Sequence, residues 1–214
     1  MHPVLALLAS ALLAVLAFNI VTTGFERAGV PRSATGTLVF LSLAGSLVNL
    51  PLKVRNVPGE PQRFQIGHYV FLRRPAMERQ VIAVNVGGAL IPIVLSVWIL
   101  VSNQSFWQTA VATILVIIVT NRVARRVPGK GIEMPALLPP AVAAFAAIVL
   151  SGGSGGGEAT AIAYVAGTMG TLIGADLLNL RNLKEMGPGV MSIGGAGVFD
   201  GVFLSGIVAA FLSW

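Results

Sequence analysis

Two carboxylates stand in stretches of sequence that are otherwise apolar. Asp176 lies within residues 170–180, and Asp200 lies within residues 194–204. A charged side chain at the centre of a bilayer costs about 2.5–3.5 kcal/mol on insertion scales, so an acid in such a position is a functional hypothesis by default. Two carboxyl groups close together in an apolar site share one proton and can act as base and acid on one water molecule. We therefore predict that Asp176 and Asp200 form a catalytic pair of the aspartic-protease type.

Each acid also has a structural interpretation. Asp200 could cap a helix, where a carboxylate meets unpaired N–H groups, and Asp176 could form a polar contact or an ion pair with Arg181. A different functional interpretation is a proton- or sodium-coupled transporter that uses Asp176 and Asp200. Its secondary candidate residues are Asn49, Asn85 and Asn179, because polar side chains beside glycine-broken helices mark such sites. Each Asn could equally make a helix-to-helix hydrogen bond, worth about 0.6 kcal/mol on average.

The composition says where this chemistry takes place. Of 214 residues, 55% are hydrophobic and 10% are charged, and the mean hydropathy is +0.85. Soluble domains carry about 25% charged residues, so an ordinary cytosolic enzyme, a disordered tail and a nucleic-acid-binding module are excluded. There is no Cys, and the only His residues are His2 and His68. We predict no metal and no cofactor, because thiol and imidazole ligands are almost absent.

A membrane helix needs about 20 mostly apolar residues. The sequence predicts an all-α fold, a single integral membrane domain over 1–214 with seven transmembrane helices. They lie near 3–24, 33–52, 80–102, 106–121, 134–151, 159–180 and 190–213. The last one is interrupted by glycine, and its regular part is expected to start only near Val198.

The basic residues indicate the orientation of these spans. Twelve of the fourteen Lys and Arg fall in the three alternate loops near 53–79, 122–131 and 181–189, and the other two are Arg27 and Arg32. This asymmetry predicts that the three loops and the N-terminus are cytoplasmic and that the C-terminus is outside. We expect a multi-pass protein of a prokaryotic plasma (inner) membrane, with membrane lipids as partners of the basic loops and no nucleic acid. The oligomeric state stays open.

The cytoplasmic loop 53–79 has two interpretations. Strand-forming residues over 63–72 follow the turn residues Pro58 and Gly59. This pattern is typical of a short β-hairpin. It also suits an interfacial segment anchored by Tyr69 and Phe71.

The predicted topology brings the two acids to a similar depth. Asp176 precedes Arg181, at the cytoplasmic end of its span, by about 7 Å of helix. Asp200 falls in the first turn of the last span, which starts on the same side. A third element opens the fifth span there, where Pro135, Ala136 and Leu137 belong to a proline-rich segment. Prolines leave backbone groups free of helical hydrogen bonds.

These three elements resemble the GxGD-type intramembrane aspartyl proteases, the family of presenilin and signal peptide peptidase. The similar features are Asp176, the segment Gly195-Ala196-Gly197 with Asp200 after it, and the tripeptide Pro135-Ala136-Leu137. The motif order is permuted, since Pro-Ala-Leu precedes both acids here. Val198 and Phe199 also separate the Gly-x-Gly from its Asp, and Ala175 stands where the family has Tyr. The sequence segments around both acids also resemble a prokaryotic family of multi-pass membrane proteins of unknown function.

The resemblance implies an intramembrane di-aspartyl protease that cleaves transmembrane-helix substrates near the cytoplasmic side. Asp176 and Asp200 would then be the catalytic residues. The implied substrate-binding residues are Pro135, Ala136 and Leu137, which would hold an unwound substrate backbone, and Gly195 and Gly197, which would let it approach.

Overall fold

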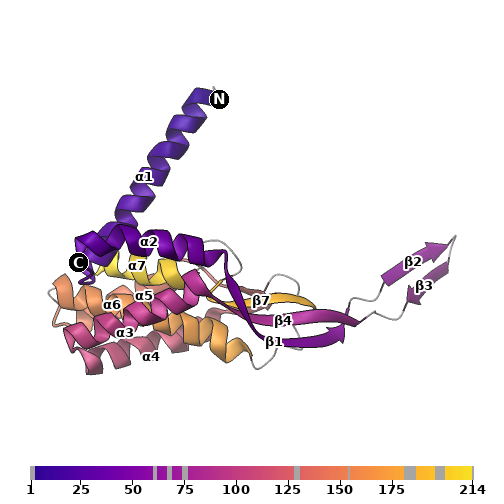
Figure 1. Ribbon diagram of the computed structural model, residues 1–214. Coiled ribbons are helices and arrows are strands. Elements are labelled where there is room, and N and C mark those ends of the chain that lie inside the picture. Colours follow the sequence, from indigo (N-terminus) through magenta and orange to yellow (C-terminus); the bar gives the residue numbers. More distant parts are fainter. Residues whose placement is uncertain are drawn as a thin grey trace.

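The computed structural model describes residues 3–59, 62–66, 69–73, 77–127, 131–153, 155–180, 187–195 and 201–213. Most of this part of the chain is helical (Figure 1). Its α-helices are α1 (Pro3–Arg27), α2 (Arg32–Ser46), α3 (Ile91–Asn103), α4 (Phe106–Val123), α5 (Leu138–Leu150), α6 (Gly156–Thr171) and α7 (Gly201–Leu212). Two π-helical segments, η1 (Val86–Leu90) and η2 (Leu172–Leu177), extend α3 at its start and α6 at its end.

Helix α6 is the centre of the bundle and packs against α3, α4, α5 and α7. In the segment formed by α6 and its extension, 72% of an 18-residue window is buried, against 22% for α4. Small residues allow this close packing. At Gly170, for example, an added Cβ would lie 2.5 Å from Cβ of Val116 on α4. The C-terminal part of α6 is therefore packed tightly against α4.

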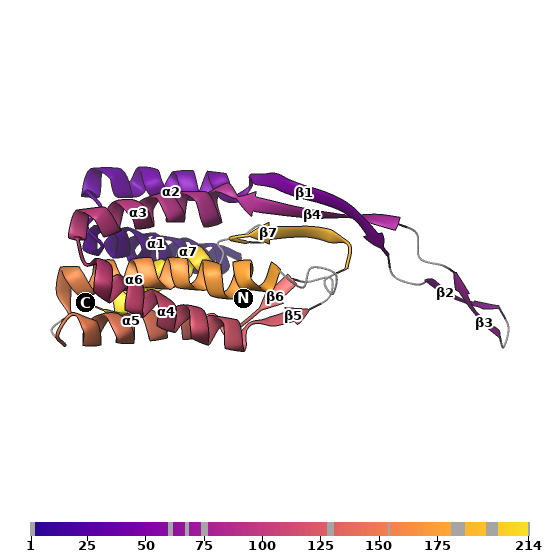
Figure 2. The same cartoon turned by 90° about the horizontal axis from the view of Figure 1, so that it is seen from below.

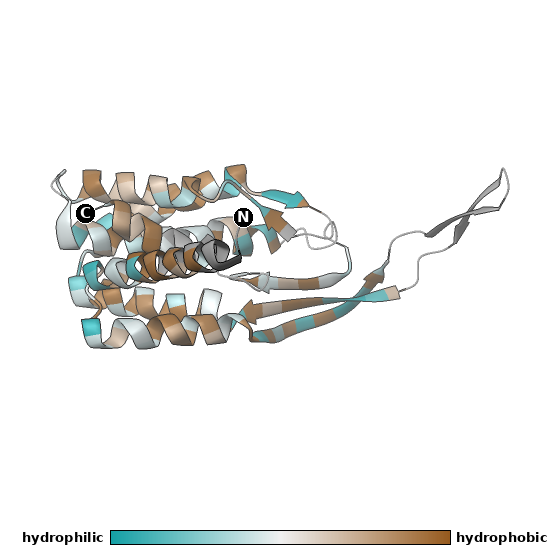
Figure 3. Ribbon diagram, turned by 90° about the horizontal axis from the view of Figure 1, so that it is seen from above, coloured by the Kyte–Doolittle hydropathy of each residue, from teal (hydrophilic) through white to brown (hydrophobic). Residues whose placement is uncertain are grey.

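Three helical segments are long and apolar enough to cross a membrane. They are Val86–Asn103, Phe106–Val123 and Gly156–Leu180, and Leu138–Leu150 is a shorter apolar helix. Large apolar side chains also lie on the outside, including Val94 at 69% exposure and Trp107 at 76%. Figure 3 shows hydrophobic residues along the helices of the bundle. A bilayer accepts such a surface, whereas water does not.

A three-stranded sheet leaves the bundle at one end. Its strands are β1 (Asn49–Pro58), β4 (Met77–Asn85) and β7 (Gly189–Ile193), in the order β1-β4-β7. β1 runs antiparallel to β4, and β7 runs parallel to it, with Val190 beside Val81. Two hairpins, β2 (Gln62–Ile66) with β3 (Tyr69–Arg73) and β5 (Arg125–Val127) with β6 (Gly131–Glu133), lie at the same end (Figure 2).

The sheet corrects the expectation of an all-α fold. The apolar stretches predicted as helices over 33–52, 80–102 and 190–213 each include a strand, namely β1, β4 and β7. Short apolar runs have the same hydropathy in a helix end and in a buried strand, so the pattern does not separate the two. The pairing of β4 with β7 joins residues about a hundred positions apart, which local sequence does not reveal.

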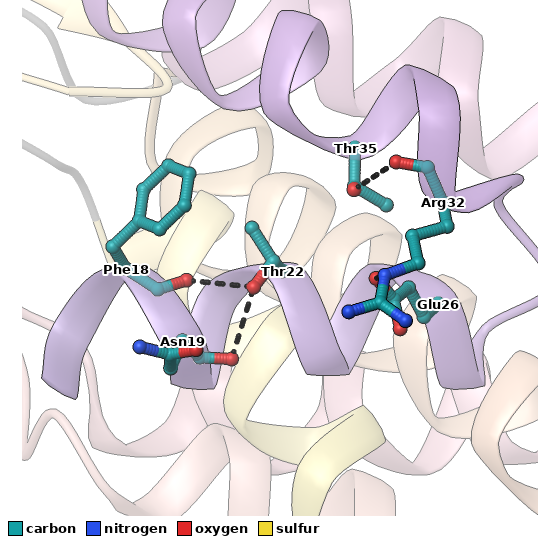
Figure 4. Close-up of polar contacts among 6 residues, drawn as sticks. All are labelled: Phe18, Asn19, Thr22, Glu26, Arg32 and Thr35. Atoms are coloured by element: carbon teal, nitrogen blue, oxygen red, sulfur yellow. Dashed lines mark hydrogen bonds and ion pairs between the residues drawn. The ribbon is translucent and has the colours of Figure 1, made fainter. Parts of the chain in front are cut away.

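Helix α1 leans away from the bundle along its first half (Figure 1). Its polar side chains bond within the helix: Asn19 Nδ2 donates to the Val15 carbonyl at 2.8 Å, and Thr22 Oγ1 donates to the Phe18 carbonyl at 3.0 Å. An ion pair of 3.5 Å between Glu26 and Arg32 bridges the turn to α2 (Figure 4). These contacts shape the α1–α2 corner, at the opposite end of the bundle from the sheet.

Candidate functional site

Asp176 is positioned by the π-helical segment η2 at the end of the central helix. Helix α4 fixes this segment, because a Cβ on Gly174 would lie 2.7 Å from the Ile117 carbonyl oxygen. Asn121 Nδ2 on α4 also donates to the Gly174 carbonyl at 3.1 Å. π-helical turns are rare and occur frequently at functional sites. The chain therefore presents Asp176 from a wide turn with a fixed position.

The Asp176 carboxylate contacts the end of strand β7. The Gly194 N–H donates to Asp176 Oδ2 at 2.8 Å, and the Asp176 side chain is half-buried. Gly194 has φ +79°, and a Cβ on it would lie 2.7 Å from the backbone N of Ala89 in η1. Only glycine fits this position, where η1, η2 and the end of β7 meet.

Gly194 packs on η1, and a chain of hydrogen bonds connects the start of η1 to β1 and β7. The Gly88 N–H donates to Asn85 Oδ1 at 2.7 Å, and Gly88 packs directly on the Gly194 carbonyl. Asn85 Nδ2 donates to Asn49 Oδ1 at 3.1 Å and to the Ser46 carbonyl at 2.7 Å. Ser192 Oγ lies 2.5 Å from the same Asn49 oxygen. These hydrogen bonds connect the three strands to the start of η1, and the packing of Gly88 on Gly194 brings η1 against the residue that binds Asp176.

The predicted secondary residues fall into two groups. Asn49 and Asn85 belong to the chain of hydrogen bonds described above, at one paired position of β1 and β4. Asn179 does not join it, because its Nδ2 donates to the Ala175 carbonyl at 2.8 Å and to the Gly174 carbonyl at 3.3 Å. This bond stabilises the end of the helix that carries Asp176.

The predicted substrate-binding residues are only partly described. Gly195 is buried and donates its N–H to the Ser192 carbonyl at 3.3 Å. Pro135, Ala136 and Leu137 form an exposed turn before α5, whereas the main neighbours of η2 are α4, α6 and β7. Asp200 and Gly197 lie outside the described residues, so the predicted meeting of the two acids stays a prediction.

Several residues of the site were not singled out from the sequence. Gly194 and Gly88 belong to the glycine pairs 194–195 and 87–88 within apolar segments, and glycines in such positions indicate a close backbone approach. Ser192 carries no comparable signal, because a single serine in an apolar strand is unremarkable. Within the described residues, no three His, Cys, Asp or Glu side chains come together as a metal-binding group.

The comparisons with known proteins give a family without an activity. No curated protein and no solved structure matches the chain. One family matches residues 43–212, which is most of the chain and includes every residue of the site, and its description is a protein of unknown function. The chain therefore belongs to the DUF1614 family.

Proposed function

We propose that this chain is an intramembrane protease of the di-aspartyl type, with Asp176 and Asp200 as its catalytic residues. One observation carries the proposal. Strand β7 is paired on only one side within the described part of the chain, and it is followed directly by Gly194, whose N–H binds the Asp176 carboxylate. An open strand edge therefore leads directly to a membrane-embedded acid.

An open strand edge could bind a substrate segment that has unwound from a membrane helix. A helix hides its peptide bonds in its own hydrogen bonds, so a substrate has to unwind before cleavage. An extended segment that adds to a free sheet edge gains main-chain hydrogen bonds in exchange. Such an addition to β7 would carry the substrate backbone to Asp176.

The two edges of the sheet differ in a way that favours β7 as the receiving strand. Edge strands are commonly protected by proline, lysine and bulges. β1 has all three, since it contains Pro51, Lys53 and Pro58 and a register shift between Pro51 and Lys53. β7 has the sequence Gly-Val-Met-Ser-Ile, without a charge or a proline. The unprotected edge is the one that ends beside the acid.

The packing of α7 supports the partnership of the two acids. Asp200 directly precedes α7, which returns along α6 with Gly206 against Thr168. Asp176 follows Thr168 by about two helical turns, and Gly201, the first residue of α7, precedes Gly206 by about one and a half. The start of α7 therefore lies at a height similar to that of Asp176, and the proposal is that Asp200, the preceding residue in the sequence, meets Asp176 there. One carboxylate would accept a proton from water, whose oxygen attacks the peptide carbonyl, while the protonated carboxyl group donates to the carbonyl oxygen.

Cleavage of a single-span reporter helix tests the proposal. Asp176→Asn and Asp200→Asn should each reduce cleavage by about 10⁴-fold or more, and the double variant should lose little beyond that, because the pair acts as a unit. The matched control is Glu158→Gln, an acid at the far end of the same helical segment whose Oε1 accepts a hydrogen bond from Ser105. It should cleave at the parental rate. Parental activity in Asp176→Asn would end the protease proposal.

An ion-coupled carrier is the second candidate, favoured by the polar residues at the broken start of the α3 span. The described contacts support it less well. Asn49 Oδ1 lies against two donors and Asn85 Oδ1 accepts the Gly88 N–H, so protein groups already bind both amide oxygens. Ion-dependent uptake into vesicles, lost in Asp176→Asn without any cleaved product, would favour the carrier.

The proposed topology is seven spans in a prokaryotic inner membrane, with the N-terminus inside and the C-terminus outside. In support, β1 to β4, β5 with β6, and β7 all leave the same end of the bundle (Figures 1 and 2). These connections include the three basic loops. They would therefore face the cytoplasm and the anionic lipid headgroups.

A further inference from the structure

The end of the molecule that carries the sheet has an excess of positive charge. Within the described residues of β1, β4, β5, β6 and the last turn of α4, six side chains are basic and two are acidic. The basic ones are Lys53, Arg55, Arg79, Arg122, Arg125 and Arg126, and the acidic ones are Glu78 and Glu133. Strand β7 itself carries no charge. An extended segment that lies along β7 would therefore meet mainly basic side chains.

Arg79 is the basic residue on the strand next to β7. β4 is the neighbour of β7 in the sheet, and Arg79 is its only basic residue. The following residue, Gln80, lies beside Gly189 at the start of β7 and is fully buried. Because side chains alternate along a strand, Arg79 lies on the opposite, exposed face, the one that also carries Val190.

The charge of Arg79 is not balanced on this outer face. Val54, Val81 and Val190 lie side by side across the three strands of it. The other charged residues of the sheet within the described part are on the opposite face by the strand register, namely Lys53, Arg55 and Glu78. Arg79 has no ion pair within the described residues either. An acidic side chain beside β7 on this face would therefore find a single, unpaired cation.

The position of Arg79 favours a polypeptide over a lipid as its partner. Arg79 precedes Asn85, the last residue of β4 before η1, by six residues. Six residues of strand span about 20 Å. The headgroup layer on one side of a bilayer is only about 5–8 Å thick. In the proposed topology Arg79 would thus lie beyond the headgroups, where the cytoplasmic segment of a membrane protein passes.

We infer that the sheet selects substrates by the charge of the cytoplasmic segment next to their membrane helix, and that it accepts an acidic segment and disfavours a basic one. This inference rests on the proposed protease function. A substrate segment paired along the free edge of β7 would lie two strand spacings, about 10 Å, from β4. Arg79 and a substrate carboxylate could bridge that distance with their side chains.

Such a preference would separate substrates from most other membrane proteins. The cytoplasmic ends of membrane helices usually carry Lys and Arg. Like charges that meet at an interface raise the free energy of the wrong complex, which is a common source of specificity. The positive sheet would therefore keep ordinary membrane proteins away from β7 and admit the smaller class with acidic flanks.

Three reporters that differ in one pair of residues test the inference. Each is a single-span Leu/Ala helix with a Gly-Gly pair near its cytoplasmic end. Glu-Glu, Gln-Gln or Lys-Lys follows about five residues further into the cytoplasmic segment, because β7 is five residues long. In neutral detergent micelles we expect kcat/KM to fall by about fivefold from the Glu-Glu to the Lys-Lys reporter. The difference should disappear at about 1 M salt, which screens charges beyond about 3 Å.

A charge reversal locates the preference. Arg79→Glu should bring the Glu-Glu and Lys-Lys reporters to within about twofold of each other or reverse their order. The matched control is Lys53→Glu, the same change in net charge at an exposed position of β1, on the other edge and the other face of the sheet. It should keep the preference of the parent. A loss of the preference to the same extent in both variants would overturn the inference.

The inference and the protease proposal fail in different ways. Equal cleavage of the three reporters by the parent chain, or faster cleavage of the Lys-Lys reporter, removes the charge selection and leaves the protease. If the parent chain cuts none of the reporters, the protease proposal fails. Binding of the labelled reporters to the Asp176→Asn chain, measured by fluorescence anisotropy, then decides the selection separately. The Glu-Glu reporter should bind more tightly than the Lys-Lys reporter, and equal affinities would overturn the inference.

Discussion

At the scale of single residues, the site depends on one backbone amide and one carboxylate. The bond from Gly194 to Asp176 joins the end of β7 to η2 at a place where neither could shift without losing it. The geometry at Gly194 therefore sets where Asp176 stands relative to the open strand edge.

Gly194→Ala should be strongly destabilising. The left-handed backbone at φ +79° costs a side chain about 1–2 kcal/mol. The added Cβ would also overlap Ala89, and overpacking typically costs a further 1–3 kcal/mol. The control is Gly153→Ala, because Gly153 has φ +81° but nothing within 4 Å of its Cβ position. Chemical denaturation in micelles should show a loss of about 2–5 kcal/mol at 194 and about 1–2 kcal/mol at 153. Equal losses in the free energy of unfolding at 194 and 153 would mean that the contact between Gly194 and η1 does not contribute to stability.

The unusual residues could be predicted from the sequence, but their contacts could not. Asp176 and Asn85 stand out because polar groups in apolar segments need a partner. One partner of Asp176 is the backbone amide of Gly194, and every residue type except proline carries such an amide. Sequence patterns could therefore identify the acid but not Gly194 as its donor.

At the scale of elements, the strands β1, β4 and β7 of the three-stranded sheet were the part that hydropathy could not predict. The run Val81–Val84 continues into the apolar η1 and α3, so the segment 80–102 looks like one helix. Asn85 marks the true boundary, because its side chain accepts the Gly88 N–H at the start of η1 and its backbone is still extended. The mostly helical character of the described residues and the candidate spans Val86–Asn103, Phe106–Val123 and Gly156–Leu180 could be predicted, since apolar length is a local property.

Asn85→Leu tests whether this boundary holds the site together. The change removes the cap of η1 and the bonds to Asn49 and to the Ser46 carbonyl in a position that is 2% exposed. Leaving buried partners unsatisfied typically costs about 1–3 kcal/mol each. The thermal unfolding temperature of Asn85→Leu should therefore be clearly lower than that of the parent, and its cleavage of the reporter should be weaker. Asn103→Leu, at the other end of α3, should stay within about 0.5 kcal/mol of the parent because Asn103 is exposed. A similar effect of both changes would show that the Asn85 contacts do not matter.

At the scale of the whole molecule, the fold separates two kinds of surface. The helices carry exposed apolar side chains, and the sheet end carries the connections with most of the Lys and Arg. This separation is what a bilayer imposes on a bundle with short connections at one end and long ones at the other. In the proposed protease, this arrangement would place the open edge of β7 and the Asp176 carboxylate close to the boundary between hydrocarbon and headgroups, where water is available for hydrolysis.

The orientation of the bundle in the membrane can be measured by cysteine labelling. No native cysteine has to be removed first, because the chain contains none. Single cysteines at Asn56 in β1, at Ser102 near the end of α3 and at His2 would be treated with a membrane-impermeant maleimide. If the positive-inside rule applies, Ser102→Cys should react in intact cells, whereas Asn56→Cys and His2→Cys should react only after permeabilisation.

Reaction of Asn56→Cys and Ser102→Cys from the same side would contradict a bundle whose sheet end and opposite end face different compartments. Reaction of His2→Cys in intact cells would show that α1, which leans away from the bundle, does not cross the membrane. The labelling of Asn56→Cys and Ser102→Cys would then still decide which side the sheet end, and Asp176 with it, faces.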